Sequence, residues 1–162
     1  MVNGEITRSI IGAFYEVYNT LGFGFHENLY IIALERELIA RGHQVAREVS
    51  VIVYYKGEEL GRQRLDMLVD GKVVVETKST YELPKAARRQ LLNYLHAARI
   101  EVGLLLHFGP EANFYRIVCR QPASIRGDPG PPRDPRSPLV VDVGNTGSLR
   151  NDASSSPTGL AD

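Results

Sequence analysis

The chain has 162 residues, 43% of them hydrophobic and 23% charged, which suits a single domain with a buried core. Its 19 basic and 19 acidic residues cancel to a formal net charge of zero, which counts against a protein that coats nucleic acid or a membrane but allows a local basic cleft. It has one cysteine, Cys119, no apolar run long enough to span a bilayer and no signal-peptide pattern at its start, so we expect a cytoplasmic protein without an internal disulfide.

Two helices are predicted in the first part of the chain. Residues 5–20 carry apolar side chains at helical spacing, and Gly22 and Gly24 then end the helix. A second helix is expected from about His26 to Arg41. The side chains expected on its apolar face are Leu29, Ala33, Leu34 and Leu38.

Three strands should follow. Apolar residues alternate with others along 45–55, a second strand covers roughly 60–69, and a third covers 72–78. The pair Asp70-Gly71 between the last two is a strong signal for a hairpin turn. Three consecutive valines open the third strand, so we expect it to lie in the centre of a sheet.

A third helix and two more strands complete the expected domain. The helix begins near Pro84, where a missing N–H costs little. Its apolar stripe consists of Ala87, Leu91, Tyr94, Leu95 and Ala98. The apolar run 102–108 is typical of a strand buried on both faces, and 114–119 predicts the last strand. The order α-α-β-β-β-α-β-β indicates an α/β fold with a mixed sheet flanked by helices.

The composition changes sharply near Arg120. All 13 aromatic residues come before it, and seven of the nine prolines come after it. We therefore place one domain at 1–120 and predict a disordered Pro/Gly/Ser-rich tail at 121–162. One apolar patch in this tail, Leu139-Val140-Val141, could dock on the domain or form a brief strand.

Charged residues end the third strand and face the second. Glu76 and Lys78 are two apart, so they point to the same side of the strand, and Asp66 lies late in the preceding strand. Two carboxylates suit Mg²⁺, which also takes waters and phosphate oxygens and lowers the pKa of a bound water. Lys78 could hold the scissile phosphate or the attacking water. A solvated strand edge would carry the same residues.

The hairpin register tests this hypothesis. A regular two-residue turn would set Asp66 opposite Val75 and turn Glu76 to the other face. A shared metal site instead needs Asp66 opposite Glu76, and therefore a three-residue loop or a bulge. We predict that irregular hairpin.

Further polar residues have both functional and structural explanations. Gln90 and Tyr94 share a helix face, where Gln90 could orient a water or phosphate and Tyr94 could belong to the core. Glu27 stands at the start of a predicted helix, where the helix dipole favours an acidic residue, and Tyr30 is better explained by packing. A basic cluster beside Gln90 could bind phosphates or could be solvated: Lys85, Arg88 and Arg89.

The residues Gly24-Phe25-His26-Glu27-Asn28-Leu29-Tyr30 resemble the pattern that names the GxxExxY family, which is grouped with the PD-(D/E)XK nuclease superfamily. The resemblance extends over Asp66, over Glu76-Thr77-Lys78, and over Gln90 to Tyr94, which is similar to the QxxxY element of RecB-type members. It implies a metal-dependent phosphodiesterase fold. The implied metal ligands are Glu27, Asp66 and Glu76. Lys78 would be the catalytic lysine, with Gln90 and Tyr94 supporting the site or the substrate.

Two functions follow from these observations. The first is a Mg²⁺- or Mn²⁺-dependent nuclease that hydrolyses phosphodiester bonds in DNA. The alternative is a catalytically inactive nuclease-fold module that binds nucleic acid or a protein partner, which the neutral charge favours. A homodimer that cuts two strands is a further conjecture.

Overall fold

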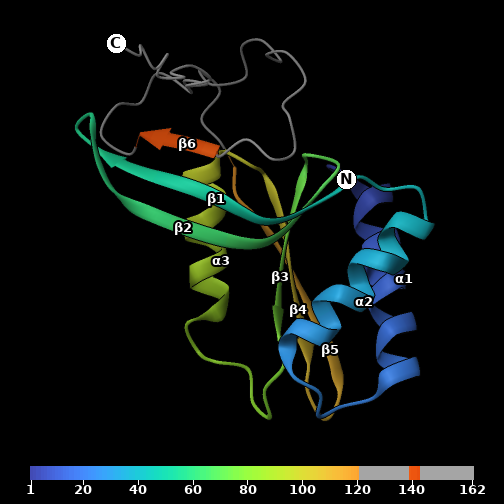
Figure 1. The fold of residues 1–162 in the computed structure, drawn as a ribbon. Helices are drawn as coiled ribbons and strands as arrows, with labels where there is room; N and C mark the ends of the chain where they lie inside the picture. The colour runs from blue at the N-terminus through green and yellow to red at the C-terminus, as the bar shows by residue number, and fades with distance from the viewer. Residues whose placement is uncertain (121–138, 143–162) are drawn as a thin grey trace, which may run out of the picture.

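A six-stranded mixed sheet lies between two helices on one face and one helix on the other (Figure 1). The computed structural model describes residues 1–120 and, as backbone, 139–142. Its elements are α1 (Gly4–Leu21), α2 (Glu27–Ala40), β1 (Val45–Tyr55), β2 (Glu58–Val69), β3 (Val73–Lys78), α3 (Ala87–Ala98), β4 (Val102–Phe108), β5 (Ala112–Val118) and β6 (Leu139–Asp142). The predicted order of helices and strands through residue 120 is confirmed.

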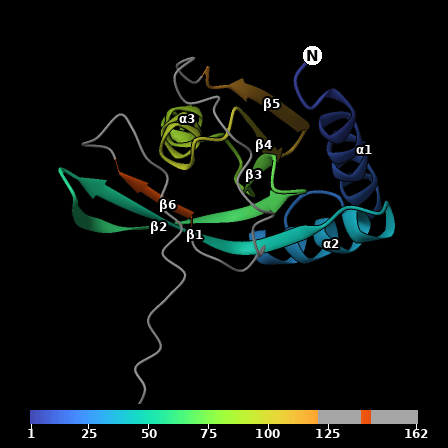
Figure 2. The same ribbon diagram turned by 90° about the horizontal axis from the view of Figure 1, so that it is seen from above.

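The strand order is β5-β4-β3-β2-β1-β6, so β3 lies inside the sheet as expected. β1, β2 and β3 form antiparallel neighbours, and α3 carries the chain across to β4, which runs parallel to β3. Figure 2 shows α1 and α2 on one side of the sheet and α3 on the other, where it lies beside the long ribbon of β1 and β2. This ribbon and α3 frame the region in which the candidate site lies.

The face of the sheet under α1 and α2 has an aromatic core. Phe14, Tyr30 and Phe108 are all completely buried. The rings of Tyr30 and Phe108 stack with centroids 4.2 Å apart, and Phe14 meets Phe108 edge-on at 4.8 Å. Such pairs add to the free energy gained from apolar burial. This face is therefore packed up to the last residue of β4.

The face under α3 has an aliphatic core. Leu91 and Leu95 of α3 are fully buried against the sheet. Gly103 on β4 allows this close approach, because a Cβ there would lie 3.0 Å from the Cδ1 atom of Leu91. Val74 and Leu105 belong to the same cluster. Side chains therefore alternate along β3, with Val74 under α3 and its neighbour Val75 under the helix pair.

The hairpin of β2 and β3 has the irregular turn that the metal hypothesis requires. Met67 pairs with Val75 and Val69 pairs with Val73, so the loop has three residues, 70–72. Asp70 and Gly71 take positive φ values of 52° and 65°. This register, continued by one residue, sets Asp66 opposite Glu76. The prediction of an irregular hairpin is confirmed.

A polar network fixes that loop to the helices. His43 connects Asp70 to Ser9 of α1, with 2.7 Å from its Nδ1 to the carboxylate and 2.7 Å from its Nε2 to the hydroxyl. The backbone N–H of Gln44 also donates to Asp70, at 2.9 Å. The network joins three segments that are far apart in sequence and holds the closed end of the hairpin.

The expected buried face of the second helix was partly wrong. Leu29 is 48% exposed, whereas Tyr30 and Ile31 are buried beside Leu34 and Leu38. The helix is rotated because the bulky ring of Tyr30 fills the space against Phe108. Other boundaries differ by a few residues, and α3 begins three residues after Pro84.

The tail prediction concerns residues that are largely outside the described part of the chain. Residues 121–138 and 143–162 lie outside it, so the expected disorder stays a prediction. Residues 139–142 form β6, which pairs in parallel with β1 from Val51 to Tyr54. The apolar patch thus adds a strand to the sheet. No helix in the described ranges is long and apolar enough to cross a membrane.

Candidate active site

Two carboxylates meet where β2 separates from β3. The last backbone pair between β2 and β3 is Met67 with Val75. Beyond this pair, hydrogen bonds from side chains join the two strands. The Asp66 N–H donates to Glu76 Oε1 at 3.3 Å. In return, Asp66 Oδ2 accepts from the Thr77 N–H at 2.8 Å and from the Thr77 hydroxyl at 3.0 Å. The two acidic side chains are therefore held beside each other by three hydrogen bonds.

Burial makes the charge of Glu76 costly. The residue is only 7% exposed. Burial, and then the nearby charge of Asp66, raise the pKa of Glu76 to about 8, while the charge of Lys78 opposes this rise. At neutral pH this carboxyl group therefore keeps its proton unless another cation is present.

The donor set fits a divalent cation. Asp66 Oδ2 and Glu76 Oε1 accept hydrogen bonds from the protein, and each carboxylate has a second oxygen that could bind a cation. Mg²⁺ prefers one or two carboxylates together with waters and phosphate oxygens. A cation there would also offset the repulsion between the two acidic groups. The pair of Asp66 and Glu76 could therefore hold such an ion.

Lys78 lies on the same face, two residues beyond Glu76. It is partly buried and stands opposite His107 in the register of β3 and β4. The positive charge of Lys78 lowers the pKa of Glu76, against the larger effects of burial and of Asp66. A cationic side chain in this position could stabilise a phosphate group that is bound at the carboxylates.

Of the three metal ligands that the resemblance implies, Glu27 reaches the other two only at the end of β3. Glu27, in the first turn of α2, accepts a long hydrogen bond of 3.4 Å from the Ser79 N–H, one residue beyond Lys78. Within residues 1–120 and 139–142, no three His, Cys, Asp or Glu side chains lie close enough to hold one metal ion. The structure thus brings Asp66 and Glu76 together and leaves Glu27 at the rim.

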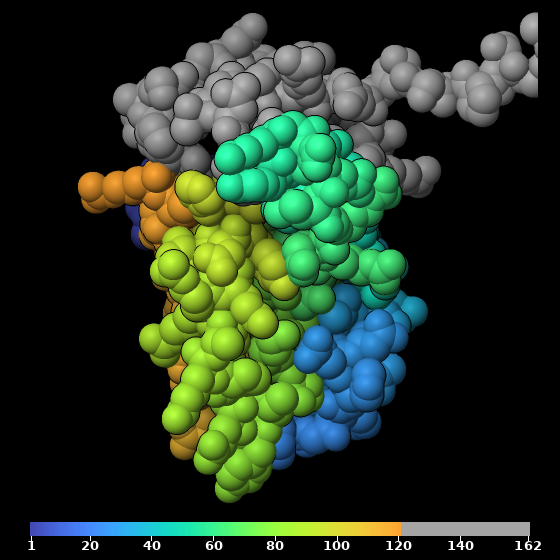
Figure 3. Space-filling view, turned by 90° about the vertical axis from the view of Figure 1, so that its left-hand side faces the viewer, coloured from blue at the N-terminus to red at the C-terminus, as the bar shows by residue number. Residues whose placement is uncertain are grey.

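Gln90 and Tyr94 line a hollow between α3 and the β1–β2 ribbon. Its volume is about 460 Å³, and Gln63 on β2 forms part of the opposite wall. Burial raises the pKa of Tyr94, and the charges of Glu76 and Asp66 raise it further. Figure 3 shows this face, with α3 in yellow-green beside the teal and green ribbon. The Tyr94 hydroxyl reaches across this hollow to Gln63 Oε1 at 3.5 Å.

The tyrosine of the N-terminal pattern has a structural role, as expected. Tyr30 is completely buried, and its hydroxyl donates to the carbonyl of Gly22 and accepts from the Phe25 N–H at 3.2 Å. It therefore fixes the loop that leads into α2. His26 begins that helix by accepting from the Asn28 N–H through its Nδ1, at 3.3 Å. This places Glu27 at the strand end.

The sequence patterns did not identify several residues that shape the site. Thr77 binds Asp66, and Ser79 binds both Glu27 and, through its hydroxyl, the Phe25 carbonyl at 2.7 Å. His107 is 5% exposed, and its Nε2 lies 2.8 Å from the Thr80 carbonyl. One signal was available for His107, because it is the single polar side chain in the apolar run 102–108.

The basic cluster is divided between two roles. The Arg88 guanidinium stacks 3.7 Å above the ring of Tyr115 on β5, so this side chain is turned toward the sheet. Lys85 and Arg89 are exposed near the start of α3. Lys85 and Arg89 are therefore accessible to a phosphate group, whereas Arg88 packs on an aromatic ring.

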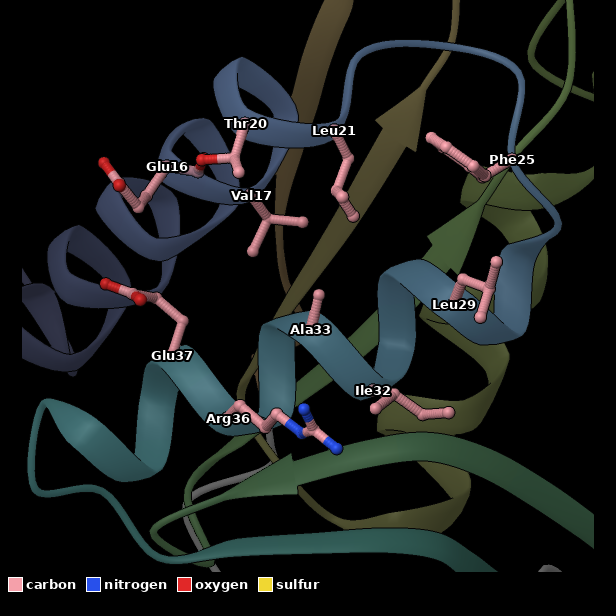
Figure 4. Close-up of a pocket in the computed structure, with 10 residues that line it drawn as sticks. All are labelled: Glu16, Val17, Thr20, Leu21, Phe25, Leu29, Ile32, Ala33, Arg36 and Glu37. Atoms are coloured by element: carbon pink, nitrogen blue, oxygen red, sulfur yellow. The ribbon is translucent and has the colours of Figure 1, made fainter.

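A second hollow lies between α1 and α2, away from the carboxylates. It has a volume of about 630 Å³ and a mostly apolar lining. Figure 4 shows Val17 and Leu21 of α1 pointing toward Ala33 of α2. Neither the carboxylate pair nor Lys78 lines it. Its chemistry therefore does not resemble that of a phosphate site.

A family model matches the part of the chain that carries this geometry. A search of the curated proteins finds no match. The crystal structure of SSO0001 is similar over 57% of this chain and 50% of that protein, with 23% identity and a TM-score of 0.47. The chain thus spans half the length of that protein. The family model described as PD-(D/E)XK nuclease superfamily matches residues 4–117, which include α1 to β4, all but the last residue of β5 and the whole candidate site. The chain therefore belongs to the PD-(D/E)XK nuclease superfamily.

Proposed function

We propose that the chain is a divalent-metal-dependent nuclease that hydrolyses phosphodiester bonds in DNA, and that it belongs to the GxxExxY branch of its superfamily. The observation that carries this proposal is the carboxylate pair of Asp66 and Glu76, with Lys78 on the same face of β3. A core serving stability alone would place apolar groups there, because buried carboxylates are costly without a cation.

Each side chain has a distinct part in the proposed reaction. Asp66 and Glu76 would hold Mg²⁺ or Mn²⁺, which supplies Lewis acidity and lowers the pKa of water when bound. Lys78 places positive charge beside the phosphate on which negative charge develops. Gln90 and Tyr94 position the substrate from the wall of the hollow, and Glu27 approaches from the end of β3 as a third ligand or as a group that orients water.

The test is cleavage of single-stranded DNA, double-stranded DNA and RNA with Mg²⁺ or Mn²⁺. Lys78→Met and Asp66→Asn should each lower the rate at least about 100-fold, as expected when a group that stabilises transition-state charge is removed. Lys72→Met and Glu58→Gln are the controls, because they change exposed charged residues on the loop of this hairpin and on β2 without touching the carboxylate pair. The controls should keep their activity.

One observation favours the alternative of an inactive module that binds nucleic acid or a protein. The three predicted ligands do not form a single cluster within the described residues. Direct titration with Mn²⁺ separates the two functions. If Mn²⁺ binds and no substrate is cut, the nuclease proposal is wrong and the binding module takes its place. Cleavage that survives both Lys78→Met and Asp66→Asn would place the active site elsewhere.

A further inference from the structure

Two exposed aromatic rings meet just beyond the carboxyl end of β3. Phe23, from the loop between α1 and α2, is 43% exposed, and Tyr81, which follows β3, is 76% exposed. Their ring centroids are 6.4 Å apart with an interplanar angle of 63°. Neither ring belongs to either core cluster of the described residues. Packing of the core therefore does not explain why two large apolar rings are placed here.

The loops that carry these rings are fixed to each other and to the strand end. The Ser79 hydroxyl donates to the Phe25 carbonyl at 2.7 Å, two residues after Phe23. His107 holds the Thr80 carbonyl at 2.8 Å, one residue before Tyr81. The phenol of Tyr30 fixes the other loop. The two rings therefore lie on two anchored segments, the loop between α1 and α2 and the segment that follows β3. Figure 1 shows both segments at the lower end of the molecule.

The ring pair lies within a few nucleotides of the candidate site. Tyr81 is three residues from Lys78, and three residues span at most about 10 Å of extended chain. A DNA strand advances about 3.4 Å per nucleotide in the B form. A strand whose phosphate lies at Lys78 could therefore place a base within about three nucleotides against Phe23 or Tyr81.

We propose that Phe23 and Tyr81 form a stacking platform for unpaired nucleobases, so that the site takes a single-stranded segment of DNA. The proposal rests on the proposed function for its choice of DNA as the ligand. Rings stack on bases whose faces are open, and in a duplex neighbouring pairs cover those faces. The formal net charge of zero gives the chain no overall attraction for phosphate backbones, so a binding contribution from stacking matters more here than in a basic protein.

The chain contains a matched control for this platform. Tyr15 on α1 and Phe114 on β5 form another exposed pair, each 37% exposed, with centroids 6.3 Å apart. This pair joins α1 to β5, which is two strands away from β3 in the sheet. Replacing a ring there removes a similar exposed aromatic group without touching the proposed platform.

The experiment measures binding of a fluorescein-labelled oligothymidylate and of a labelled duplex by fluorescence anisotropy, with Ca²⁺ in place of Mg²⁺. Tyr81→Ala and Phe23→Ala should each weaken single-strand binding roughly 5- to 150-fold, the range expected for loss of one stacked base. Duplex binding should change little. Tyr81→Phe should bind like the unaltered protein, because it keeps the ring, and Phe114→Ala should do the same. Circular dichroism would verify that each variant folds.

Two results would overturn the platform: alanine variants that bind the single strand as the unaltered protein does, or an equal loss on duplex and single strand. A cleavage assay on the same proteins tests the proposed function separately. Cleavage by the unaltered protein with no effect of Tyr81→Ala on binding or cutting removes the platform and leaves the nuclease. Loss of single-strand binding in a protein that never cuts removes the nuclease and leaves the platform as a binding surface.

Discussion

The two faces of the sheet differ most where β3 and β4 end. Under the helix pair, Phe108 and Tyr30 carry the apolar core to the last residue of β4. Under α3, the aliphatic core stops earlier, and Glu76, Lys78 and His107 occupy the same level of the strands. Alternation of side chains along the same two strands therefore separates stability on one face from candidate chemistry on the other.

The largest effect should come from the helix-pair face. Phe108→Ala removes a ring that contacts Phe14 and Tyr30, and it should lower the free energy of unfolding by roughly 3–5 kcal/mol. Urea unfolding followed by circular dichroism measures this loss. Phe114→Ala on the adjacent strand is the control, because that ring is 37% exposed, and it should cost about 1 kcal/mol or less. Equal losses in the two variants would contradict the comparison.

On the α3 face, replacing Glu76 should raise the free energy of unfolding rather than lower it, and the size of the effect should depend on pH. Because the pKa of Glu76 is raised from 4.5 to about 8, the unfolded chain releases this proton at lower pH than the folded chain does. The group therefore costs no stability below about pH 4.5, costs more as pH rises, and reaches its full cost above about pH 8. Glu76→Gln should stabilise the protein at pH 9 by a few kcal/mol, at about 1.4 kcal/mol per pKa unit.

Thermal unfolding across this pH range measures the effect. The advantage of Glu76→Gln should vanish near pH 4.5, and Mn²⁺ should raise the melting temperature of the unaltered protein at pH 8 but not that of the variant. Glu58→Gln, an exposed position on β2, is the control and should show no such pH dependence. A variant that is less stable than the unaltered protein at pH 9 would show that Glu76 supports the fold.

A smaller effect should come from the residue that holds Asp66. Thr77→Val removes the hydroxyl that donates to Asp66 Oδ2 at 3.0 Å and keeps the backbone donor. Loss of such a supporting hydrogen bond should weaken Mn²⁺ affinity about 10- to 100-fold. Isothermal titration calorimetry measures the affinity, and Thr77→Ser should restore most of it. If Thr77→Val binds Mn²⁺ as tightly as the unaltered protein, Asp66 does not depend on this contact.

Periodicity was sufficient to predict the order of elements, because the apolar pattern changes cleanly between helix and strand. It failed along α2 for a physical reason. Residues 29–34 are all apolar or aromatic, so spacing alone does not distinguish the buried face from the exposed one. The contact of Tyr30 with Phe108, 78 residues away, decides the rotation and leaves Leu29 in solvent.

Only the part of the candidate site that lies on the β2–β3 hairpin could be predicted from the sequence. The chemistry of a shared metal required Asp66 opposite Glu76, and the register of the hairpin agrees. The partners Thr77, Ser79 and His107 depend on contacts between segments that the sequence does not bring together. The same holds for Glu27, whose distance from the other two carboxylates is set by the docking of α2 on the end of β3.

The buried phenol of Tyr30 has a consequence for how relatives of this chain are recognised. Gly24, Glu27 and Tyr30 make up the pattern. Tyr30 hydrogen-bonds to the loop before α2 and fixes its conformation, whereas Glu27 lies at the end of β3. Selection on folding alone would preserve the tyrosine in a descendant that has lost its activity. A match at the aromatic position therefore indicates a shared fold, whereas the proposed activity depends on the charged residues Asp66, Glu76 and Lys78.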